Sequence, residues 1–154
     1  MPYKILFICH GNICRSTMAE YVMRHLVRET GLEGRIVADS AAATRDALGW
    51  GVHEGTRDVL RRHGIPCGGH RSTPMTRADY GRYDLIVGMD EENRRDMMRI
   101  LGSDPDGKVR LLLDWTDEPR DVADPWYTDD FDTTYADVRR GCDALLADVI
   151  SGGR

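Results

Sequence analysis

A cysteine and an arginine near the start of the chain have the types and the spacing needed for phosphoryl chemistry. Cys9 and Arg15 are separated by five residues. A thiol beside a helix N-terminus and a guanidinium ionises to a nucleophilic thiolate. The planar fork of arginine can hold two oxygens of a tetrahedral dianion. The pair therefore predicts attack by sulfur on a phosphoryl group, although the spacing alone fits a buried strand cysteine and an exposed helix arginine equally well.

The residues around this pair are suited to binding an anion. Gly11 and Asn12 tolerate positive φ, so the chain can curl there and point successive backbone N–H groups inward. The apolar run Ile5–Cys9 before them predicts a strand that is buried on both faces. We expect Ser16 and Thr17 to cap the amphipathic helix that follows. A curled loop that ends at a helix N-terminus is an anion site.

A second candidate group lies in the acidic segment 114–137. There Pro125 rigidifies the turn and pushes Asp124 toward an extended backbone. Trp126 and Tyr127 follow, as needed to hold a carboxyl group beside an aromatic leaving group. The competing interpretation is that Asp124 is one of many solvated acids. The neighbouring acids are Asp114, Asp117, Asp121, Asp129, Asp130 and Asp132.

Strands and helices alternate along the chain and must position these groups. The predicted strands are 5–9, 35–41, 84–90 and 109–113, and the predicted helices include 54–63, 91–101 and a last one with an apolar stripe from 135 to 149. The alternation predicts an α/β fold, a single domain over residues 1–154 with a four-stranded parallel sheet and helices on both faces. Ligands bind at the carboxyl edge of such a sheet, where Cys9 emerges. Cys142 lies on the stripe of the last helix and is expected in the core.

Composition narrows the setting and the partners. The formal charge is −5 with no basic run, which argues against nucleic acid and anionic membranes as partners. No apolar run approaches the ~18 residues needed to span a bilayer. The apolar run near the N-terminus has too few residues for a secretory signal segment. We expect a cytoplasmic protein whose four cysteines are mainly reduced. No Cys/His cluster has zinc-ligand spacing, so no metal and no cofactor are expected.

The run 9–17 reads Cys-His-Gly-Asn-Ile-Cys-Arg-Ser-Thr and closely resembles the signature of the low-molecular-weight protein tyrosine phosphatases, Cys-x-Gly-Asn-x-Cys-Arg-Ser-Pro. Thr17 stands where that family usually has Pro, and both residues suit a helix start. The family's general acid lies in an Asp-Pro pair followed by two aromatics. Asp124 matches it, with Trp126 in place of the commoner Tyr. The resemblance covers essentially the whole chain and implies hydrolysis of phosphotyrosine in a protein, or of a small aryl phosphate, with inorganic phosphate as product.

The resemblance also implies roles for individual residues. Cys9 would form a thiophosphate, Arg15 and the loop amides would stabilise the equatorial oxygens, and Asp124 would act as acid and then as base. The substrate-binding residues implied are His10, Gly11, Asn12, Ile13, Cys14, Ser16, Trp50, Trp126 and Tyr127. The supporting residues implied are Ser40, which would hydrogen-bond the signature asparagine, and His70, which would brace the loop from behind. A strand-end turn serine, a surface histidine and a tryptophan lid over the local core are the competing interpretations of Ser40, His70 and Trp50.

Four other functions stay open at this stage. Arsenate reductases of the superfamily use a similar loop but need further cysteines to relay a disulfide, and no Cys pair follows the predicted sheet. A branch that dephosphorylates arginine has Thr in place of Ile13, and isoleucine with aromatic walls favours a phenolic ester. A redox sensor would use a reversible disulfide between Cys9 and Cys14. A phosphoprotein-binding module would need no acid, so Asp124 argues against it.

Overall fold

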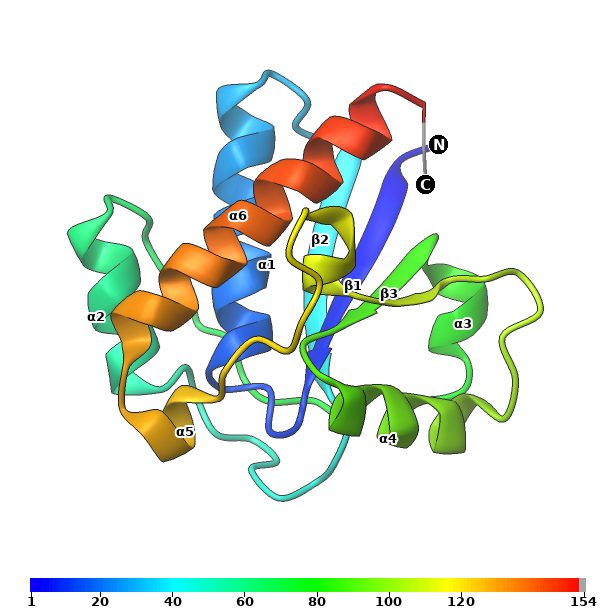
Figure 1. Ribbon diagram of the computed structural model, residues 1–154, viewed down its shortest axis with the longest axis horizontal. Helices are drawn as coiled ribbons and strands as arrows, with labels where there is room; N and C mark the ends of the chain where they lie inside the picture. The colour runs from blue at the N-terminus through cyan, green and yellow to red at the C-terminus, as the bar shows by residue number, and fades with distance from the viewer. Residues whose placement is uncertain (153–154) are drawn as a thin grey trace.

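The structure is a computed structural model that describes residues 1–152, so the last two residues of the predicted domain lie outside it. The strands are β1 (Tyr3–Cys9), β2 (Ile36–Ala42), β3 (Leu85–Gly88) and β4 (Val109–Leu111) (Figure 1). The helices are α1 (Arg15–Glu29), α2 (Glu54–Arg62), α3 (Asp79–Arg82), α4 (Glu91–Leu101), α5 (Pro125–Thr128) and α6 (Phe131–Ile150), with a 3-10 turn η1 (Leu112–Trp115). Within residues 1–152 no helix is both long and apolar enough to cross a bilayer.

All four strands are parallel and lie in the order β2-β1-β3-β4, which confirms the predicted sheet. The chain runs from β1 to β2 on one side and reaches β3 on the other side, so the carboxyl end of β1 is a topological switch point. Open α/β sheets bind their ligands at such a point. The end of β1, the loop after β2 and α5 all lie at the lower end of the molecule in Figure 1.

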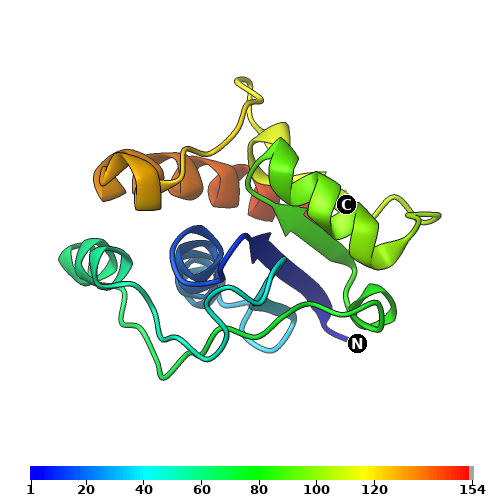
Figure 2. The same ribbon diagram turned by 90° about the horizontal axis from the view of Figure 1, so that it is seen from below.

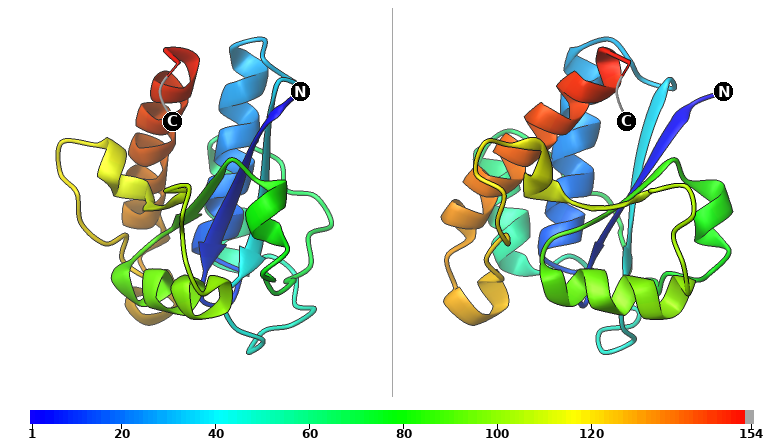
Figure 3. Two further views of the ribbon diagram at one scale, coloured as in Figure 1. Left: turned by 90° about the vertical axis from the view of Figure 1, so that its right-hand side faces the viewer. Right: turned by 45° about the vertical axis from the view of Figure 1, so that its right-hand side comes forward.

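Helices cover both faces of the sheet, as the sequence predicts. Ile5 and Phe7 of β1 point to one face, where they join the apolar stripes of α1 and α6 in the larger core. Leu6 and Ile8 point to the other face and pack against side chains of α4 that include Met97. Figure 2 shows α1 and α6 on one side of the sheet with α3 and α4 on the other, and Figure 3 shows α1 and α6 side by side. Burial on both faces explains why β1 is apolar without alternation.

The N-terminus of α1 differs from the prediction that Ser16 and Thr17 cap it. The helix begins at Arg15, its N-cap is Cys14, and no side chain caps it. Thr17 Oγ1 instead donates to the Cys14 carbonyl at 3.0 Å, and Ser16 turns to Cys9. The cap prediction was wrong because the first turn of α1 closes the loop around Cys9. N–H groups of that turn are therefore left without a capping side chain.

Two segments in the second half of the chain form a different type of structure from the one predicted. The fourth strand ends at Leu111, and the residues predicted to extend it form η1, in which the Asp114 carboxylate accepts from the Leu111 N–H at 3.1 Å. Leu112 and Leu113 are buried in either conformation, so an apolar run cannot separate the two. The acidic segment contains α5, a short helix that was not predicted. Asp124 at its N-cap and Pro125 at its first position are the ordinary signals for a helix start.

Candidate active site

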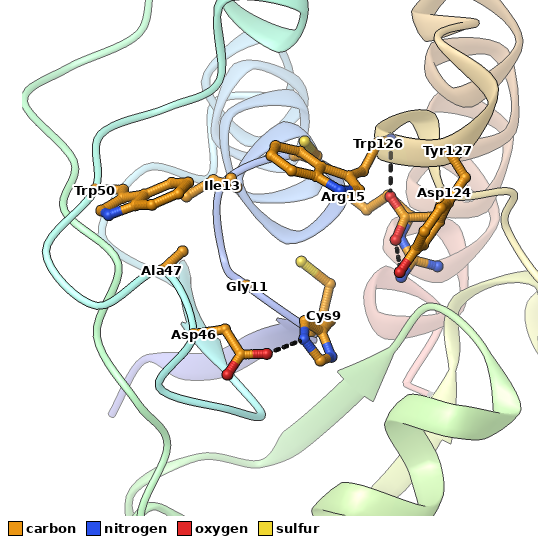
Figure 4. A pocket seen from close by; sticks show the side chains of 12 residues that line it. Cys9, Gly11, Ile13, Arg15, Asp46, Ala47, Trp50, Asp124, Trp126 and Tyr127 are labelled. Carbon is orange, nitrogen blue, oxygen red and sulfur yellow. Dashed lines mark hydrogen bonds and ion pairs between the residues drawn. The ribbon is translucent and has the colours of Figure 1, made fainter.

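A cavity of about 290 Å³ opens at the carboxyl end of β1 (Figure 4). Its walls come from the loop after β1, the loop after β2 and the first turn of α5. It is lined by Cys9, His10, Gly11, Ile13, Cys14, Arg15, Asp46, Ala47, Trp50, Asp124, Trp126 and Tyr127. Asn12 and Ser16, which were expected among the substrate-binding residues, are fully buried behind this lining. The three residues that the sequence analysis marked as catalytic therefore share one cavity although they are far apart in the chain.

The Cys9 sulfur receives two contacts from Ser16. The Ser16 hydroxyl lies 3.1 Å from Cys9 Sγ, and the Ser16 N–H donates to the same sulfur at 3.4 Å. Asn12 Nδ2 donates to Ser16 Oγ at 2.8 Å, which leaves the Ser16 proton free to point at the sulfur. Cys9 is only 3% exposed and ends β1 in its parallel pairing with Ala42. The sulfur is thus fixed at the floor of the cavity by a strand and a helix N-terminus.

Asn12 holds the loop in its curled shape from behind. Its φ of 57° is in the left-handed region, which Asn tolerates better than most residues. One amide donates to two hydroxyls, those of Ser16 and of Ser40, the latter at 2.9 Å. Ser40 in turn donates to Glu20 at 2.5 Å. Burial raises the pKa of Glu20, and the hydrogen bond from Ser40 and the charge of Arg24 offset part of this rise.

Two further side chains bind carbonyl groups of the loop. His70 Nε2 lies 3.0 Å from the Asn12 carbonyl, and the Ser72 hydroxyl donates to the Gly11 carbonyl at 2.8 Å. Both residues come from the segment that precedes α3. Carbonyls bound from behind in this way suit an anion-binding nest, in which the N–H groups of a loop point to the opposite side.

Arg15 is 2% exposed and its donors are divided between two tasks. Nη1 donates to Asp90 Oδ2 at 2.7 Å and to the Val122 carbonyl at 2.8 Å, which fixes the guanidinium. Nη2 is only 3.4 Å from Asp124 Oδ2, and Nε has no partner within residues 1–152. These two nitrogens share one edge of the planar group, so this edge is available to bind two oxygens of an anion. Burial acts to lower the pKa of Arg15, but the facing Cys9, Asp124 and Asp90 raise it above its usual value.

Asp124 is the N-cap of α5 and lies at the mouth of the cavity. Its Oδ1 accepts from the Trp126 N–H at 3.1 Å, and its side chain is 24% exposed. The neighbouring acids have other places. Asp121 accepts from the Glu91 N–H and Asp130 caps α6, and none of the acids from 114 to 132 other than Asp124 lines the cavity. Asp124 thus differs from the other acids of this segment because it lines the same cavity as Cys9.

Aromatic side chains form the outer walls of the cavity. Trp50 and Trp126 are 53% and 55% exposed and lie on either side of Ile13 in Figure 4. Tyr127 is 84% exposed and stands beyond Asp124. Large apolar groups this exposed at the rim of a cavity form a surface for an apolar partner. Trp50 therefore lines the cavity and does not cover the local core.

Two acids of the site were missed by sequence reasoning. Asp46 Oδ2 accepts a hydrogen bond from His10 Nε2 at 2.6 Å, and both residues line the cavity. Asp90 is the N-cap of α4, and its Oδ1 accepts from the Asn93 N–H at 2.7 Å. Its second oxygen binds Arg15, and nothing in the sequence signals that contact across 75 positions.

The other cysteines are chemically quiet. Burial first, and then the charges of Cys9 and Asp124, raise the pKa of Cys14 to about 12. Cys142 is fully buried in the core between α1 and α6, and burial raises its pKa far above the usual value. Cys67 is half-buried and burial also raises its pKa. In the part of the chain that the structure describes, no three metal-ligating side chains come together.

Comparison with known proteins agrees with this geometry. Residues 4–152 match the family model described as low molecular weight phosphotyrosine protein phosphatase, and the chain belongs to this family. It is 39% identical over 148 residues to the low molecular weight protein-tyrosine-phosphatase YfkJ of Bacillus subtilis, covering 95% of each chain. The crystal structure of that protein superposes with a TM-score of 0.95, covering 100% of this chain and 98% of the other. A drosophila arginine phosphatase has the same fold, at a TM-score of 0.84 and 26% identity, covering 94% of this chain and 96% of the other.

Proposed function

We propose that this protein hydrolyses phosphotyrosine monoesters through a thiophosphate on Cys9. The observation that carries the proposal is the shared cavity, in which the Cys9 sulfur, the open edge of Arg15 and the Asp124 carboxyl face one another. Nucleophile, anion clamp and acid are the three parts that phosphomonoester cleavage through a covalent intermediate needs. The names of the relatives, which are tyrosine phosphatases, support the same activity.

In the first step the Cys9 thiolate attacks phosphorus in line with the ester oxygen. An S–P bond forms while the P–O bond to the phenol breaks, and the bonding electrons leave with the phenol oxygen. Asp124 gives its proton to that oxygen, so a neutral phenol departs. The loop N–H groups and the Nε and Nη2 edge of Arg15 bind the equatorial oxygens, where charge is held in the transition state.

In the second step water attacks phosphorus from the side that the phenol has left. Asp124, now a carboxylate, takes a proton from this water, and the S–P bond breaks to return the Cys9 thiolate. The products are inorganic phosphate and the free enzyme. Ser16 stabilises the leaving thiolate, because its hydroxyl and its N–H both reach the sulfur.

The walls of the cavity favour an aryl phosphate over a phosphoguanidine. Ile13, Trp50 and Trp126 give a phenolic ring apolar surfaces to contact, whereas a guanidinium would lose water there without gaining a polar partner. The carboxyl groups that line the cavity are those of Asp124, at its mouth, and of Asp46, which is bonded to His10. We therefore infer phosphotyrosine in proteins, with small aryl phosphates as surrogates, as the substrate class, and phosphoarginine as the second candidate because of the arginine phosphatase among the structural neighbours.

The geometry disfavours the three remaining functions. A disulfide relay needs a reachable second thiolate, but Cys142 is buried in the core and Cys14 holds its proton with a pKa of about 12. The same raised pKa slows closure of a disulfide by Cys14, which a redox sensor would require. A binding module has no use for an acid beside the sulfur.

Charge and cysteine state support the proposed setting. The net charge of −5 disfavours binding to nucleic acid or to anionic membranes. All four cysteines are free thiols, as expected in a reducing compartment, and we infer a cytoplasmic protein.

The test is steady-state hydrolysis of phosphotyrosine and of phosphoarginine by the purified protein, together with Cys9→Ser. We expect turnover of phosphotyrosine, little of phosphoarginine, and loss of more than about a hundredfold in Cys9→Ser, because serine is a far weaker nucleophile at neutral pH. The variant should still bind phosphate and vanadate, since the loop and Arg15 remain. Turnover by Cys9→Ser near the wild-type rate would remove Cys9 as nucleophile, and preference for phosphoarginine would move the substrate class.

A further inference from the structure

His53 lies where three parts of the molecule meet behind the cavity. It is the N-cap of α2, with Nδ1 accepting from the Gly55 N–H at 2.9 Å, so the ring proton is on Nε2. Its own N–H donates to the Ile13 carbonyl at 2.9 Å. Its ring makes a T-shaped contact with Trp126, with centroids 5.8 Å apart and ring planes at 82°, and it stacks on Phe131 with centroids 5.1 Å apart.

These contacts join the two halves of the cavity. Ile13 belongs to the loop that carries Cys9 and Arg15, whereas Trp126 belongs to α5, which carries the acid. Trp126 is tied to Asp124 by the bond from its N–H to Oδ1. A residue that touches both halves sets the distance between the sulfur side and the acid side of the site.

The surroundings of His53 leave little room for adjustment. A Cβ added to Gly55 would lie 2.4 Å from the Phe131 ring, so the first turn of α2 is already in close contact with α6. On the other side of this contact, Thr134 of α6 donates to the Ala123 carbonyl at 3.2 Å, next to the acid. The imidazole is therefore held between Phe131 of α6 and Trp126, and its position determines where Trp126 lies in the wall of the cavity.

We propose that His53 is a positioning residue that holds Trp126, and with it the aromatic wall beside Asp124, at the distance from the phosphate loop that an aryl phosphate requires. The inference rests on the proposed phosphatase function. His53 does not touch the reacting atoms, and it acts through the edge-to-face contact of its ring with Trp126. Such contacts prefer this geometry because the edge of one aromatic ring is positive and the face of the other is negative.

His63 supplies a matched control at the other end of the same helix. It is the C-cap of α2 and stacks on Tyr135 of α6, with centroids 3.9 Å apart and ring planes at 11°. Both histidines thus cap α2 and stack on an aromatic of α6, but His63 and Tyr135 are not part of the cavity lining. A loss of α2–α6 packing alone would be the same for both histidines.

The experiment compares four variants with wild type. His53→Asn and His53→Ser keep a capping oxygen for Gly55 and remove the ring, whereas His53→Phe keeps a ring and removes the acceptor. His63→Asn removes the control stack. The measurements are kcat and KM for phosphotyrosine, the inhibition constant of inorganic phosphate, the Kd of benzylphosphonate by calorimetry, and the melting temperature.

We expect His53→Asn and His53→Ser to lose roughly three- to tenfold in kcat/KM and in benzylphosphonate affinity, as one lost aromatic contact implies. Phosphate inhibition should stay within about twofold, because phosphate alone contacts the loop and not the wall. His53→Phe should restore most of kcat/KM. His63→Asn should lower the melting temperature about as much as His53→Asn and leave the kinetics unchanged.

A double-mutant cycle separates positioning through Trp126 from any other effect. If the inference holds, His53→Asn changes benzylphosphonate affinity less than about twofold once Trp126 is Ala. The same loss in both backgrounds, or an equal loss in His63→Asn, would overturn the role of His53. A wild-type protein that binds benzylphosphonate but does not hydrolyse phosphotyrosine would refute the proposed function and still leave the His53 cycle readable.

Discussion

Replacing Asp124 by Asn changes the proposed acid with little change to its surroundings. Asn is as good an N-cap as Asp, so its side-chain oxygen can keep the bond from the Trp126 N–H and α5 keeps its start. The replacement removes the proton donor and the carboxylate that faces Arg15 Nη2 at 3.4 Å. This contact is long and Arg15 is fixed by Asp90 and Val122, so we expect the guanidinium to stay in place. A change in the rate of this variant therefore reports the loss of the proton donor.

The size of the effect depends on the leaving group. Tyrosine leaves as a phenolate whose conjugate acid has a pKa near ~10, so its departure without a proton is costly. We expect Asp124→Asn to lose roughly 10²- to 10⁴-fold in the cleavage step with phosphotyrosine, the usual contribution of a positioned acid. A phenol with a pKa several units lower needs little help, and its loss should be much smaller.

The assay is kcat/KM for a series of aryl phosphates with phenols of different acidity. Asp121→Asn and Asp129→Asn are the controls. Asp121 binds the Glu91 N–H, and Asp129 ends α5 with φ at 58°, a conformation that Asn also tolerates. A dependence that is flat in wild type should become steep in Asp124→Asn alone. Steepness in either control variant, or a flat line in Asp124→Asn, would refute the assignment.

Two other predictions concern the groups around Arg15 and Cys9. Asp90→Asn should lower kcat/KM roughly tenfold and weaken phosphate inhibition, because its amide must turn a donor toward either Asn93 or Arg15, and charge-assisted bonds of this kind are strong. Unchanged inhibition would show that Arg15 needs no partner. The pKa of Cys14 near 12 means that the fold retains this proton through pH 9 and loses it only in strong alkali, so iodoacetamide at pH 8 should label Cys9 and spare Cys14 in peptide mass spectra.

The sequence was sufficient for those parts of the fold in which local signals agree. The apolar run before Cys9 gave β1, although the strand starts two residues earlier, at Tyr3. The helix predicted over 91–101 is α4, which has these bounds in the structure. The prediction for the segment after β4 was wrong because buried leucines fit a strand and a 3-10 turn equally well. The 3-10 turn is stabilised by the Asp114 carboxylate, which accepts from the Leu111 N–H.

For the site, the sequence identified groups but not the contacts between them. The family signature marked Cys9 and Arg15, yet the bond that fixes Arg15 comes from Asp90, on another strand end. His53 carried no signal at all, because its role depends on Trp126 and Phe131 meeting it from distant parts of the chain. Pairings of this kind follow from the sheet order, and a single sequence does not specify that order.

The loop gives up local stability at the points where it would bind phosphate. Asn12 adopts a left-handed conformation, α1 starts without a capping side chain, and Arg15 Nε is buried without a partner in the described residues. Each feature is unfavourable by itself, and a buried unmade hydrogen bond alone costs about 1–3 kcal/mol. The compensation comes from behind the loop. There the Asn12 side chain donates to Ser40, and Ser72 and His70 bind the carbonyls of Gly11 and Asn12. These bonds leave Arg15 Nε unsatisfied, and a tetrahedral dianion is a ligand that can bind it together with N–H groups of the loop.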